Sequence, residues 1–287
     1  MNKFISHTIF FLLGITIIFS INWSINYLII TKSDIPIKKS KILIIGDSHP
    51  SRGVNPEILE NAINVCQSAE PYIITFWKLK KIITKAQPEK VIIGFSPHNI
   101  SNFNDFKFNN ERWQLEMFKR SYLIEEFRSI NKIKIDFKQY YIFLFKQLCL
   151  FPKQNHIYYI GDHEKSDYSN LSGSQKTINK HYYFNNQKPE ISETSISYLD
   201  SIINLCIKRQ ITPILINTPL HISYKEKIPS IIQERYNKEI LRFRNQGVKI
   251  YTDSITIYKK ENFYNSDHLN NSGAKIFSKK LNQAIQK

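Results

Sequence analysis

Three consecutive residues, Asp47, Ser48 and His49, have the side chains best placed to do chemistry in this sequence. They follow Gly46 and a short aliphatic run, Ile42 to Ile45, whose length and β-branching predict a strand buried on both faces of a parallel sheet. Sites form at the carboxyl ends of such strands, so Ser48 should be exposed on a turn, where a histidine from elsewhere can activate it as a nucleophile. The same residues would also suit a plain strand-to-helix turn, with Asp47 or Ser48 as the helix N-cap.

A second group of polar residues, Asn265, Asp267 and His268, stands near the carboxyl end of the chain. His268 comes just before a predicted helix over residues 272–285, whose apolar residues fall on one face. His268 is a candidate for the histidine that takes a proton from Ser48. The alternative is a capping or buried hydrogen-bonding role.

These two groups together resemble the end blocks of the SGNH (GDSL-type) hydrolase family. Gly46, Asp47 and Ser48 match the block that carries the nucleophile, and His268, followed by a helix with Gly273, is similar to the final block. The resemblance implies a flavodoxin-like, three-layer α/β/α fold around a parallel central sheet. It also implies acyl-ester chemistry, with Ser48 as the nucleophile and His268 as its base, and no metal or organic cofactor.

The blocks between these two fit the family less tightly. The family has a glycine after the second strand, whose backbone N–H helps to stabilise the oxyanion, and this chain has Ser68 there. Serine still offers the N–H, so the resemblance assigns that role to Ser68. Asn99, after the third strand, is the candidate for the family's oxyanion-binding asparagine, although it would also suit an ordinary turn. Asp47, His49 and Asn265 are expected to line the site.

The acidic member of the expected triad departs most from the family pattern. The family places an aspartate three residues before the histidine, where this chain has Asn265, and Asp267 is the adjacent carboxylate. In one alternative Asp267 turns inward and supports His268. In a second, Ser48 and His268 work as a dyad, and in a third, catalysis is weak or absent.

Asp47, Ser48 and His49 also resemble the Asp-x-His metal motif of the metallophosphoesterases. That family requires later motifs, among them Gly-His-x-His, and no such motif occurs in the sequence. The run Gly-Asp-His at residues 161–163 is the one vague similarity. The metal-dependent interpretation therefore fails on its later motifs.

Strands and helices alternate along most of the chain and predict an α/β fold with a parallel sheet. After the first strand, further strands are expected at residues 63–66, 91–95, 213–217 and 248–251, with helices at 56–62, 72–85, 191–209, 228–244 and 272–285. Residues 102–187 interrupt the alternation with aromatic helical stretches, near 113–130 and 137–150, and a polar tract. Because loops that long are usually functional or disordered, we expect an inserted cap or lid within one domain over residues 41–287.

Residues 1–31 are predicted to form a transmembrane signal-anchor, followed by a linker over residues 32–40. Residues 4–31 contain no aspartate, glutamate, lysine or arginine. This uncharged stretch is long enough to cross a bilayer, although Asn22 and Asn26 weaken its far end. A cleaved signal peptide is the alternative, but no clear Ala-x-Ala site follows the apolar run. The positive-inside rule would keep the lysines after the span in the cytoplasm, yet large domains can be exported against such a bias.

The chain has 287 residues and a formal net charge of +16, from 40 Lys+Arg against 24 Asp+Glu. Such a balance favours anionic partners. The basic residues are spread throughout, as if by compositional bias, and no zinc-finger or RNP-type motif occurs, so we expect no nucleic-acid partner. Cys66, Cys149 and Cys206 have the pattern of buried small hydrophobic residues, not of a disulfide framework.

Together with the anchor, the resemblance implies a membrane-bound serine esterase or O-acyltransferase. Membrane-anchored relatives of the SGNH family commonly modify envelope polysaccharides, so the expected substrates are acyl esters of cell-envelope glycans or lipid-linked molecules, outside the cytoplasm. The alternative is an SGNH-like protein with weak or no catalysis, retained as a binding or scaffold subunit among envelope-assembly proteins. Ser68 and Asn265, which depart from the family pattern, favour that alternative.

Overall fold

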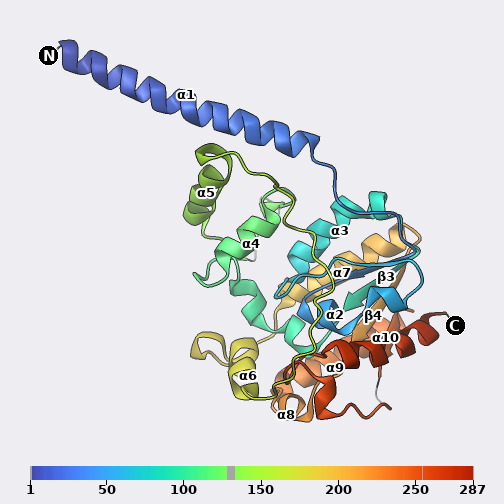
Figure 1. Ribbon diagram of the computed structural model, residues 1–287. Helices are drawn as coiled ribbons and strands as arrows, with labels where there is room; N and C mark the ends of the chain where they lie inside the picture. The colour runs from blue at the N-terminus through green and yellow to red at the C-terminus, as the bar shows by residue number, and fades with distance from the viewer. Residues whose placement is uncertain (1, 128–132, 254, 287) are drawn as a thin grey trace.

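The computed structural model describes residues 2–127, 133–253 and 255–286. Its body is a parallel β-sheet with helices packed on both faces, and a long N-terminal helix extends away from it (Figure 1). The three-layer α/β/α arrangement predicted from the sequence is therefore confirmed.

Five strands form the sheet in the order β2-β1-β3-β4-β5, and every neighbouring pair is parallel. They are β1 (Ile42–Ile45), β2 (Ala62–Asn64), β3 (Lys90–Gly94), β4 (Thr212–Asn217) and β5 (Lys249–Thr252). The chain runs from β1 outward to β2 and then returns past β1 to β3, so the strand order reverses at β1. A crevice forms outside the carboxyl ends of the strands at such a reversal, which is where a site is expected.

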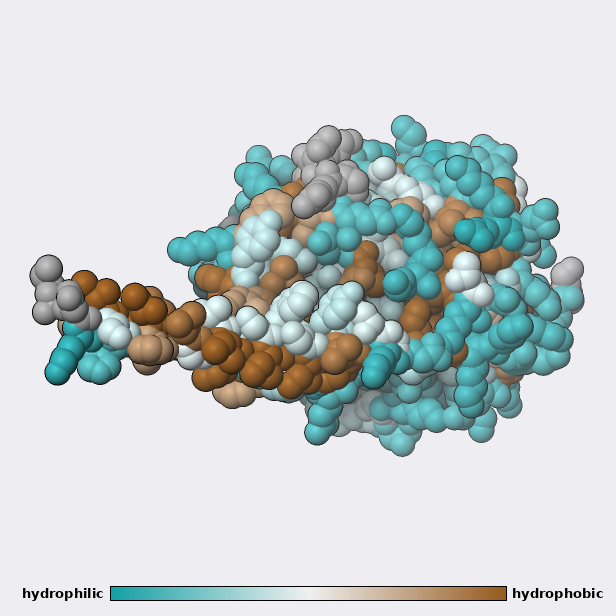
Figure 2. Space-filling model, turned by 90° about the horizontal axis from the view of Figure 1, so that it is seen from above, coloured by the Kyte–Doolittle hydropathy of each residue, from teal (hydrophilic) through white to brown (hydrophobic). Residues whose placement is uncertain are grey.

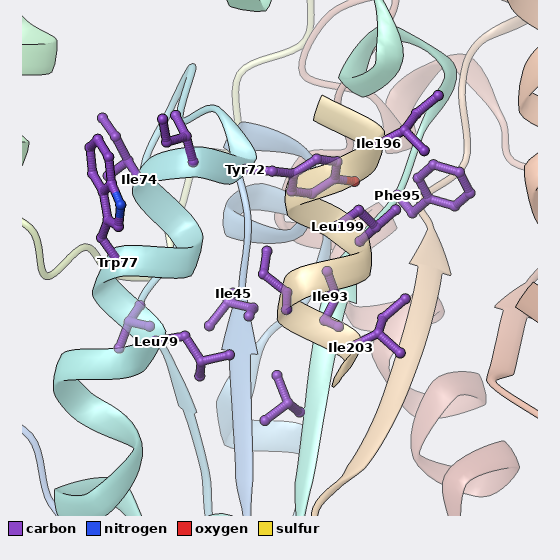
Figure 3. Packing of buried hydrophobic residues seen from close by; sticks show 14 of the residues in the cluster. Ile45, Tyr72, Ile74, Trp77, Leu79, Ile93, Phe95, Ile196, Leu199 and Ile203 are labelled. Carbon is purple, nitrogen blue, oxygen red and sulfur yellow. The ribbon is translucent and has the colours of Figure 1, made fainter. Parts of the chain in front are cut away.

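One face of the sheet is covered by α3 (Tyr72–Ala86), α7 (Glu193–Lys208) and α9 (Ser230–Asn245). Ile45 and Ile93 point into this layer and belong to one core cluster with Trp77 of α3 and Leu199 of α7 (Figure 3). Burying one such large apolar side chain stabilises the fold by about 1.5–3 kcal/mol. This layer therefore holds β1 and β3, the two strands whose ends carry the site.

The opposite face of the sheet is covered by α10 (Asn271–Ile285) and the short helix α2 (Ser48–Gly53). Ile44 and Ile92 point to this side and pack with Phe277 and Leu281 of α10. Successive residues of β1 thus alternate between two buried faces. This explains why the whole strand is apolar, as predicted for a strand inside a parallel sheet.

The remaining helical segments are mostly short. They are η1 (Pro56–Ile58), η2 (Pro97–Ile100), η3 (Asn102–Phe106), α4 (Gln114–Ser121), α5 (Phe137–Phe145), the π-helix η5 (Lys146–Leu150), α6 (Ser174–Tyr182), η6 (Phe184–Asn186), α8 (Ile222–Lys225) and η7 (Lys260–Asn262). The prediction of a helix over residues 56–62 is wrong beyond the first turn. Ala62 and Ile63 pair with β1, so the chain must already be extended there.

The inserted region, residues 102–187, packs into the main core of the domain. The ring centroid of Trp77 lies 6.3 Å from that of Phe108 and 5.5 Å from that of Phe127. Residues 151–173 contain no helix or strand and lead to α6. Of the helical stretch expected at 113–130, residues 128–130 lie outside the described residues. That the region acts as a cap over the site stays a prediction.

The N-terminal helix α1 (Asn2–Lys32) is long and apolar enough to cross a membrane, as judged by length and composition. Signal sequences share this property. Hydrophobic side chains cover much of its surface in Figure 2. Near its carboxyl end, Nδ2 of Asn22 donates to two backbone carbonyls at the end of η5, at 3.1 and 2.7 Å. The helix is therefore attached to the domain by hydrogen bonds.

Asn26 makes the tightest part of this attachment, since its side chain is completely buried. Nδ2 of Asn26 donates to the carbonyls of Leu148 at 2.8 Å and Phe151 at 3.0 Å. Its Oδ1 accepts hydrogen bonds from the N–H of Lys153 at 2.8 Å and from Nε2 of His156 at 2.9 Å. The asparagine that weakens the apolar span thus supplies partners for carbonyls that the end of a helix leaves unpaired.

We expect Asn26→Leu to loosen the contact between α1 and η5. Leucine would remove the four hydrogen bonds of the buried Asn26 side chain, and a hydrogen bond contributes about 0.5–1.5 kcal/mol to stability. The thermal midpoint of the detergent-solubilised protein should fall, and limited proteolysis should cut earlier within residues 33–40. Ser24→Ala is the control, because the exposed Ser24 hydroxyl bonds only within α1. An Asn26→Leu protein as stable as this control would contradict the assignment.

Candidate active site

Ser48 lies at the carboxyl end of β1, where it is the first residue of α2. The side chain of Asp47 caps this helix by accepting the N–H of His49 at 3.0 Å. The capping role that the sequence allowed for Asp47 therefore occurs in the structure. It sets the turn that leaves Ser48 partly exposed to the site.

Two glycines let α2 lie directly against the ends of β1 and β3. Gly46 has a φ of +131°, which L residues rarely adopt, and a Cβ there would lie 3.0 Å from Cγ of Pro50. A Cβ on Gly94, at the end of β3, would lie 2.6 Å from the same atom. A larger residue at either position would therefore displace the helix that carries Ser48.

His268 is carried by a short loop that the core holds at both ends. Phe263 and Leu269 form an isolated antiparallel bridge, and both side chains are buried among the residues under α10. Asn270 caps α10, because its side chain accepts two N–H groups of the first turn. His268 is therefore not the helix cap, and its ring is free to face Ser48.

The structure brings together the two residues that the sequence assigned to nucleophile and base. Nε2 of His268 lies 2.7 Å from Oγ of Ser48, which is hydrogen-bond geometry for passing the hydroxyl proton to the ring. Burial lowers the pKa of His268 from its ordinary value of 6.5, although the Asp267 carboxylate opposes this effect. The ring is therefore neutral at pH 7, which is the state that a base requires.

Asn265 holds the other side of the His268 ring. Its Oδ1 lies 2.9 Å from Nδ1 of His268 and also accepts the backbone N–H groups of Asp267 at 3.2 Å and His268 at 2.9 Å. Because backbone N–H groups can only donate, the atom facing the ring is the amide oxygen and Nδ1 carries the proton. That tautomer leaves Nε2 free to accept the proton of Ser48.

Asp267 places a negative charge behind the same ring. Its carboxylate is fully buried, with Oδ2 3.3 Å from Nδ1 of His268 and 3.7 Å from Nε2 of His49. Neither oxygen accepts a well-aligned hydrogen bond from any residue in the described ranges. Burial acts to raise the pKa of Asp267, but its contact with His268 outweighs burial and holds that pKa well below the usual range. Asn265 thus positions the ring, whereas Asp267 can stabilise its charged form.

Asp47 connects the ends of β1 and β3. Its Oδ2 lies 2.6 Å from Nε2 of His98 and accepts Nδ2–H of Asn99 at 2.7 Å. Burial lowers the pKa of His98 to about 4, so at pH 7 this ring is neutral and donates its Nε2–H. Burial acts to raise the pKa of Asp47, but its contacts with His98 and His49 outweigh this and lower it. The amide of Asn99 is thus held on Asp47, and its role as an oxyanion donor stays a prediction.

Two residues that line the site have backbone N–H groups without a protein acceptor in the described ranges. Within the described parts of the chain, the N–H groups of Ser48 and Ser68 donate to no other residue, and both residues line the same cavity. The turn at Ser68 is held in place because its hydroxyl donates to Glu164 at 2.6 Å and its carbonyl accepts Arg120 at 2.6 Å. Such preorganised donors can stabilise negative charge that develops on a carbonyl oxygen.

His49 lies behind the pair formed by Ser48 and His268. The ring centroids of His49 and His268 are 4.8 Å apart. His49, Asp267 and His268 also bring three potential metal-ligand atoms within 4.8 Å of one another. Both ring nitrogens of His268 are already hydrogen-bonded, to Ser48 and Asn265, so the geometry suits proton transfer better than metal ligation.

Ser48 and His268 open onto a cavity of ≈ 300 Å³, which we call the site cavity. Its wall includes residues that the sequence did not single out: Arg52, His98, Lys107, Arg120 and Lys180. His98 had a local signal, because it follows the third strand. Arg52 also had one, because it lies four residues after Ser48 and therefore on the same face of α2. The other three had none, since they belong to the inserted region, far from Ser48 in the chain. A larger cavity of ≈ 490 Å³, at the ends of β4 and β5, includes neither Ser48 nor His268.

We expect Asp267→Asn to lower kcat and to move the acidic limb of the pH profile to lower pH. His268 accepts a proton only when neutral, so activity is lost as pH falls through its pKa, which lies below 6.5. The Asp267 charge raises that pKa, so without it the neutral ring persists to lower pH, but the imidazolium loses its counter-charge. Removing the triad aspartate of a serine protease costs about 10⁴-fold in kcat, and a smaller loss of about 10–100-fold is expected here because Asn265 still holds the ring.

The pH profile is measured with p-nitrophenyl acetate as the substrate, and Asn265→Asp is the matched variant. A carboxylate placed on Nδ1 of His268 should raise the pKa of the ring and move the acidic limb to higher pH. If Asp267→Asn leaves both kcat and the limb unchanged while a folded Asn265→Ala protein loses activity, Asp267 has no role and the dyad alternative holds.

Neither a protein-family model nor a curated protein matches this chain. Among solved structures, a GDSL-like lipase from Bacteroides thetaiotaomicron VPI-5482 overlays with a TM-score of 0.43 at 10% identity, over 85% of this chain and 87% of that chain. A lipase/acylhydrolase from Enterococcus faecalis overlays with a TM-score of 0.42 at 12% identity, over 86% of this chain and 95% of that chain.

Proposed function

We propose that this protein cleaves acyl esters, with Ser48 as the nucleophile and His268 as the base. The observation that carries the proposal is the 2.7 Å contact between Oγ of Ser48 and Nε2 of His268 at the carboxyl end of β1. The tautomer set by Asn265 supports it, because that tautomer leaves Nε2 without a proton. The same chemistry is implied by the resemblance to SGNH hydrolases.

In the first step, Oγ of Ser48 bonds to the ester carbonyl carbon and its proton passes to Nε2 of His268. The π electrons of the carbonyl move to its oxygen, next to the N–H groups of Ser48 and Ser68. When the carbonyl re-forms, the bond to the leaving alcohol breaks, and the alcohol oxygen takes the proton from His268. An acyl-serine and a neutral imidazole remain.

In the second step, a hydroxyl compound attacks the acyl-serine and gives its proton to His268. As the bond between the acyl carbon and Oγ of Ser48 breaks, the proton returns from His268 to Oγ. Water as the attacking group yields a carboxylic acid, and a sugar hydroxyl yields a new ester. The protein is therefore proposed to be an esterase or an O-acyltransferase.

We also propose that α1 is retained as a membrane anchor. The hydrogen bonds of Asn22 and Asn26 to η5 support this, because cleavage after the apolar run would remove buried partners of the domain. On this proposal the domain lies outside the cytoplasm, close to the membrane. Acyl esters of envelope glycans or lipid-linked molecules would be its substrates, and envelope-assembly proteins its possible partners.

A non-catalytic scaffold or binding protein is the second candidate function. It has one specific observation in its favour, because the neutral Asn265 occupies the position that bonds directly to Nδ1 of His268. Without a hydrogen-bonded carboxylate there, the imidazolium is less well stabilised. Reactivity of Ser48 separates the two candidates.

A fluorophosphonate probe should label the full-length protein at Ser48. We expect Ser48→Ala and His268→Ala to abolish labelling and to lower the hydrolysis of p-nitrophenyl acetate by about 10³-fold or more. Ser201→Ala is the control, since this partly exposed serine of α7 lies outside the site cavity. Mass spectrometry of the labelled peptide identifies the site.

Two results would count against this function. A Ser48→Ala protein that hydrolyses the ester at the wild-type rate would remove Ser48 as the nucleophile. A folded wild-type protein that neither reacts with the probe nor cleaves any ester tested would support the scaffold candidate.

The orientation of the anchor is tested with a reporter enzyme that is active only outside the cytoplasm, fused after residue 287. We expect the fusion to be active, and the same fusion without residues 1–31 to be inactive. A cytoplasmic reporter that is active at the same position would show that the domain is not exported.

A further inference from the structure

The wall of the site cavity carries an excess of positive charge. Four cationic side chains line it, those of Arg52, Lys107, Arg120 and Lys180, against the single carboxylate of Asp47. That carboxylate is buried and is already engaged by three hydrogen-bonding neighbours. It therefore offsets only part of the charge that faces a bound molecule.

Two of the four cations have acidic partners of their own. Arg52 forms an ion pair with Glu164 at 2.7 Å, and Arg120 forms one with Glu116 at 2.8 Å. Arg120 also donates to the carbonyl of Ser68, so it holds the turn at Ser68, which lines the site cavity. The two arginines are therefore largely compensated within the protein.

Lys107 is almost completely buried, with 1% of its surface exposed. For that degree of burial, its positive charge has the least compensation of the four cations. Its Nζ donates to the carbonyl of Ala69 at 2.8 Å and to Oδ1 of Asn104 at 2.7 Å, and both acceptors are neutral. It forms no ion pair with a carboxylate in the described ranges. Burial lowers its pKa to about 7. A buried ammonium without a counter-ion is costly, so an anion that enters the cavity would be stabilised by it.

Lys180, on α6, also lines the site cavity and forms no ion pair with any residue that the structure describes. Burial lowers its pKa, and the nearby charge of Arg112 acts in the same direction, whereas the buried Asp267 opposes them. The charge of Lys180 also contributes to lowering the pKa of Lys107. Two lysines that form no ion pair within the described residues therefore lie on the wall of the cavity that Ser48 also lines.

We propose that the site cavity binds esters that carry an anionic group, with Lys107 and Lys180 binding that group while the ester carbonyl lies against Ser48. This proposal rests on the esterase function and names the chemical class of its substrate. A carboxylate or a phosphate in the cavity would form charge-assisted hydrogen bonds with both lysines. A neutral ester would leave them unpaired.

The size and lining of the cavity agree with a small charged group and not with a long acyl chain. Its volume of ≈ 300 Å³ is at the lower end for small-molecule sites. Its apolar side chains are few, namely Ala69, Phe103 and Trp113. A fatty-acyl chain would therefore find little apolar surface to bury there.

Two pairs of esters test the proposal on the full-length protein. p-Nitrophenyl hydrogen adipate and p-nitrophenyl methyl adipate share the scissile bond and leaving group and differ in one charge on the acyl side. p-Carboxyphenyl acetate and its methyl ester place that charge on the alcohol side. We expect kcat/KM to favour the anionic ester of at least one pair by about tenfold or more. The pair that shows the preference tells which side of the ester carries the anion.

Variants connect this preference to the two lysines. Lys180→Gln and Lys107→Gln should each bring the anionic-to-neutral ratio of kcat/KM close to one. Lys176→Gln is the matched control, because Lys176 is an exposed lysine of the same helix α6 and lies outside the site cavity. This control should keep the wild-type ratio. Competition by inorganic phosphate and by monomethyl adipate tells a phosphate group from a carboxylate.

Failure of this proposal and failure of the esterase function give different results. A protein that hydrolyses the neutral ester of both pairs at least as well as the anionic one overturns the anion site and leaves the esterase function standing. If no ester is cleaved and Ser48 is not labelled, the anion site is tested by isothermal titration of Ser48→Ala protein with inorganic phosphate and monomethyl adipate. Binding that is lost in the Lys180→Gln background supports the site, and no binding overturns it.

Discussion

The position of the reactive serine depends on one buried carboxylate. Asp47 accepts an N–H group from His49 within α2 and is bonded to His98 and Asn99, which follow β3. It therefore joins the exits of two neighbouring parallel strands and the start of the helix that packs on them. Leaving a buried polar group without its hydrogen-bond partner costs about 1–3 kcal/mol, and more for a charged group, so the contacts of the Asp47 carboxylate are strongly favoured. Ser48 is the next residue in the chain and is held by the same contacts.

The charges around Ser48 are unevenly distributed. The Asp267 carboxylate lies against the His268 ring and does not line the site cavity, whereas four cations and the one carboxylate of Asp47 line its wall. The cations favour a negatively charged substrate and the negative charge that develops on its carbonyl oxygen. One of these cations, Arg52, opposes the formation of imidazolium at His268, and Asp267 acts in the opposite direction. Substrate charge and base strength are therefore linked in this site.

The inserted region, residues 102–187, contacts the apolar helix α1 and also contributes residues to the site cavity. Its π-helix η5 accepts hydrogen bonds from Asn22 and Asn26 of α1, and α4 and α6 contribute Arg120 and Lys180 to the site cavity. Aromatic residues of this region belong to the main core cluster. The attachment of α1 and the cationic wall of the site cavity therefore depend on the same close-packed core. On the proposed function, this packing would set how the cavity is placed relative to the membrane.

The sequence by itself determined the parallel α/β fold, the apolar N-terminal helix and the pairing of Ser48 with His268 as candidates. These depend on local signals: short aliphatic runs, helical periodicity, and polar residues at the ends of strands and helices. Tertiary structure alone decided that Asn265 and Asp267 share one ring nitrogen of His268, and that Asn99 bonds to Asp47 while Lys107 and Lys180 line the cavity onto which Ser48 opens. Most of these contacts join segments that are far apart in the chain, so no local spacing encodes them. Within residues 265–268, the backbone conformation of the loop, which the packing of Phe263 and Leu269 holds, decides how each side chain meets the ring.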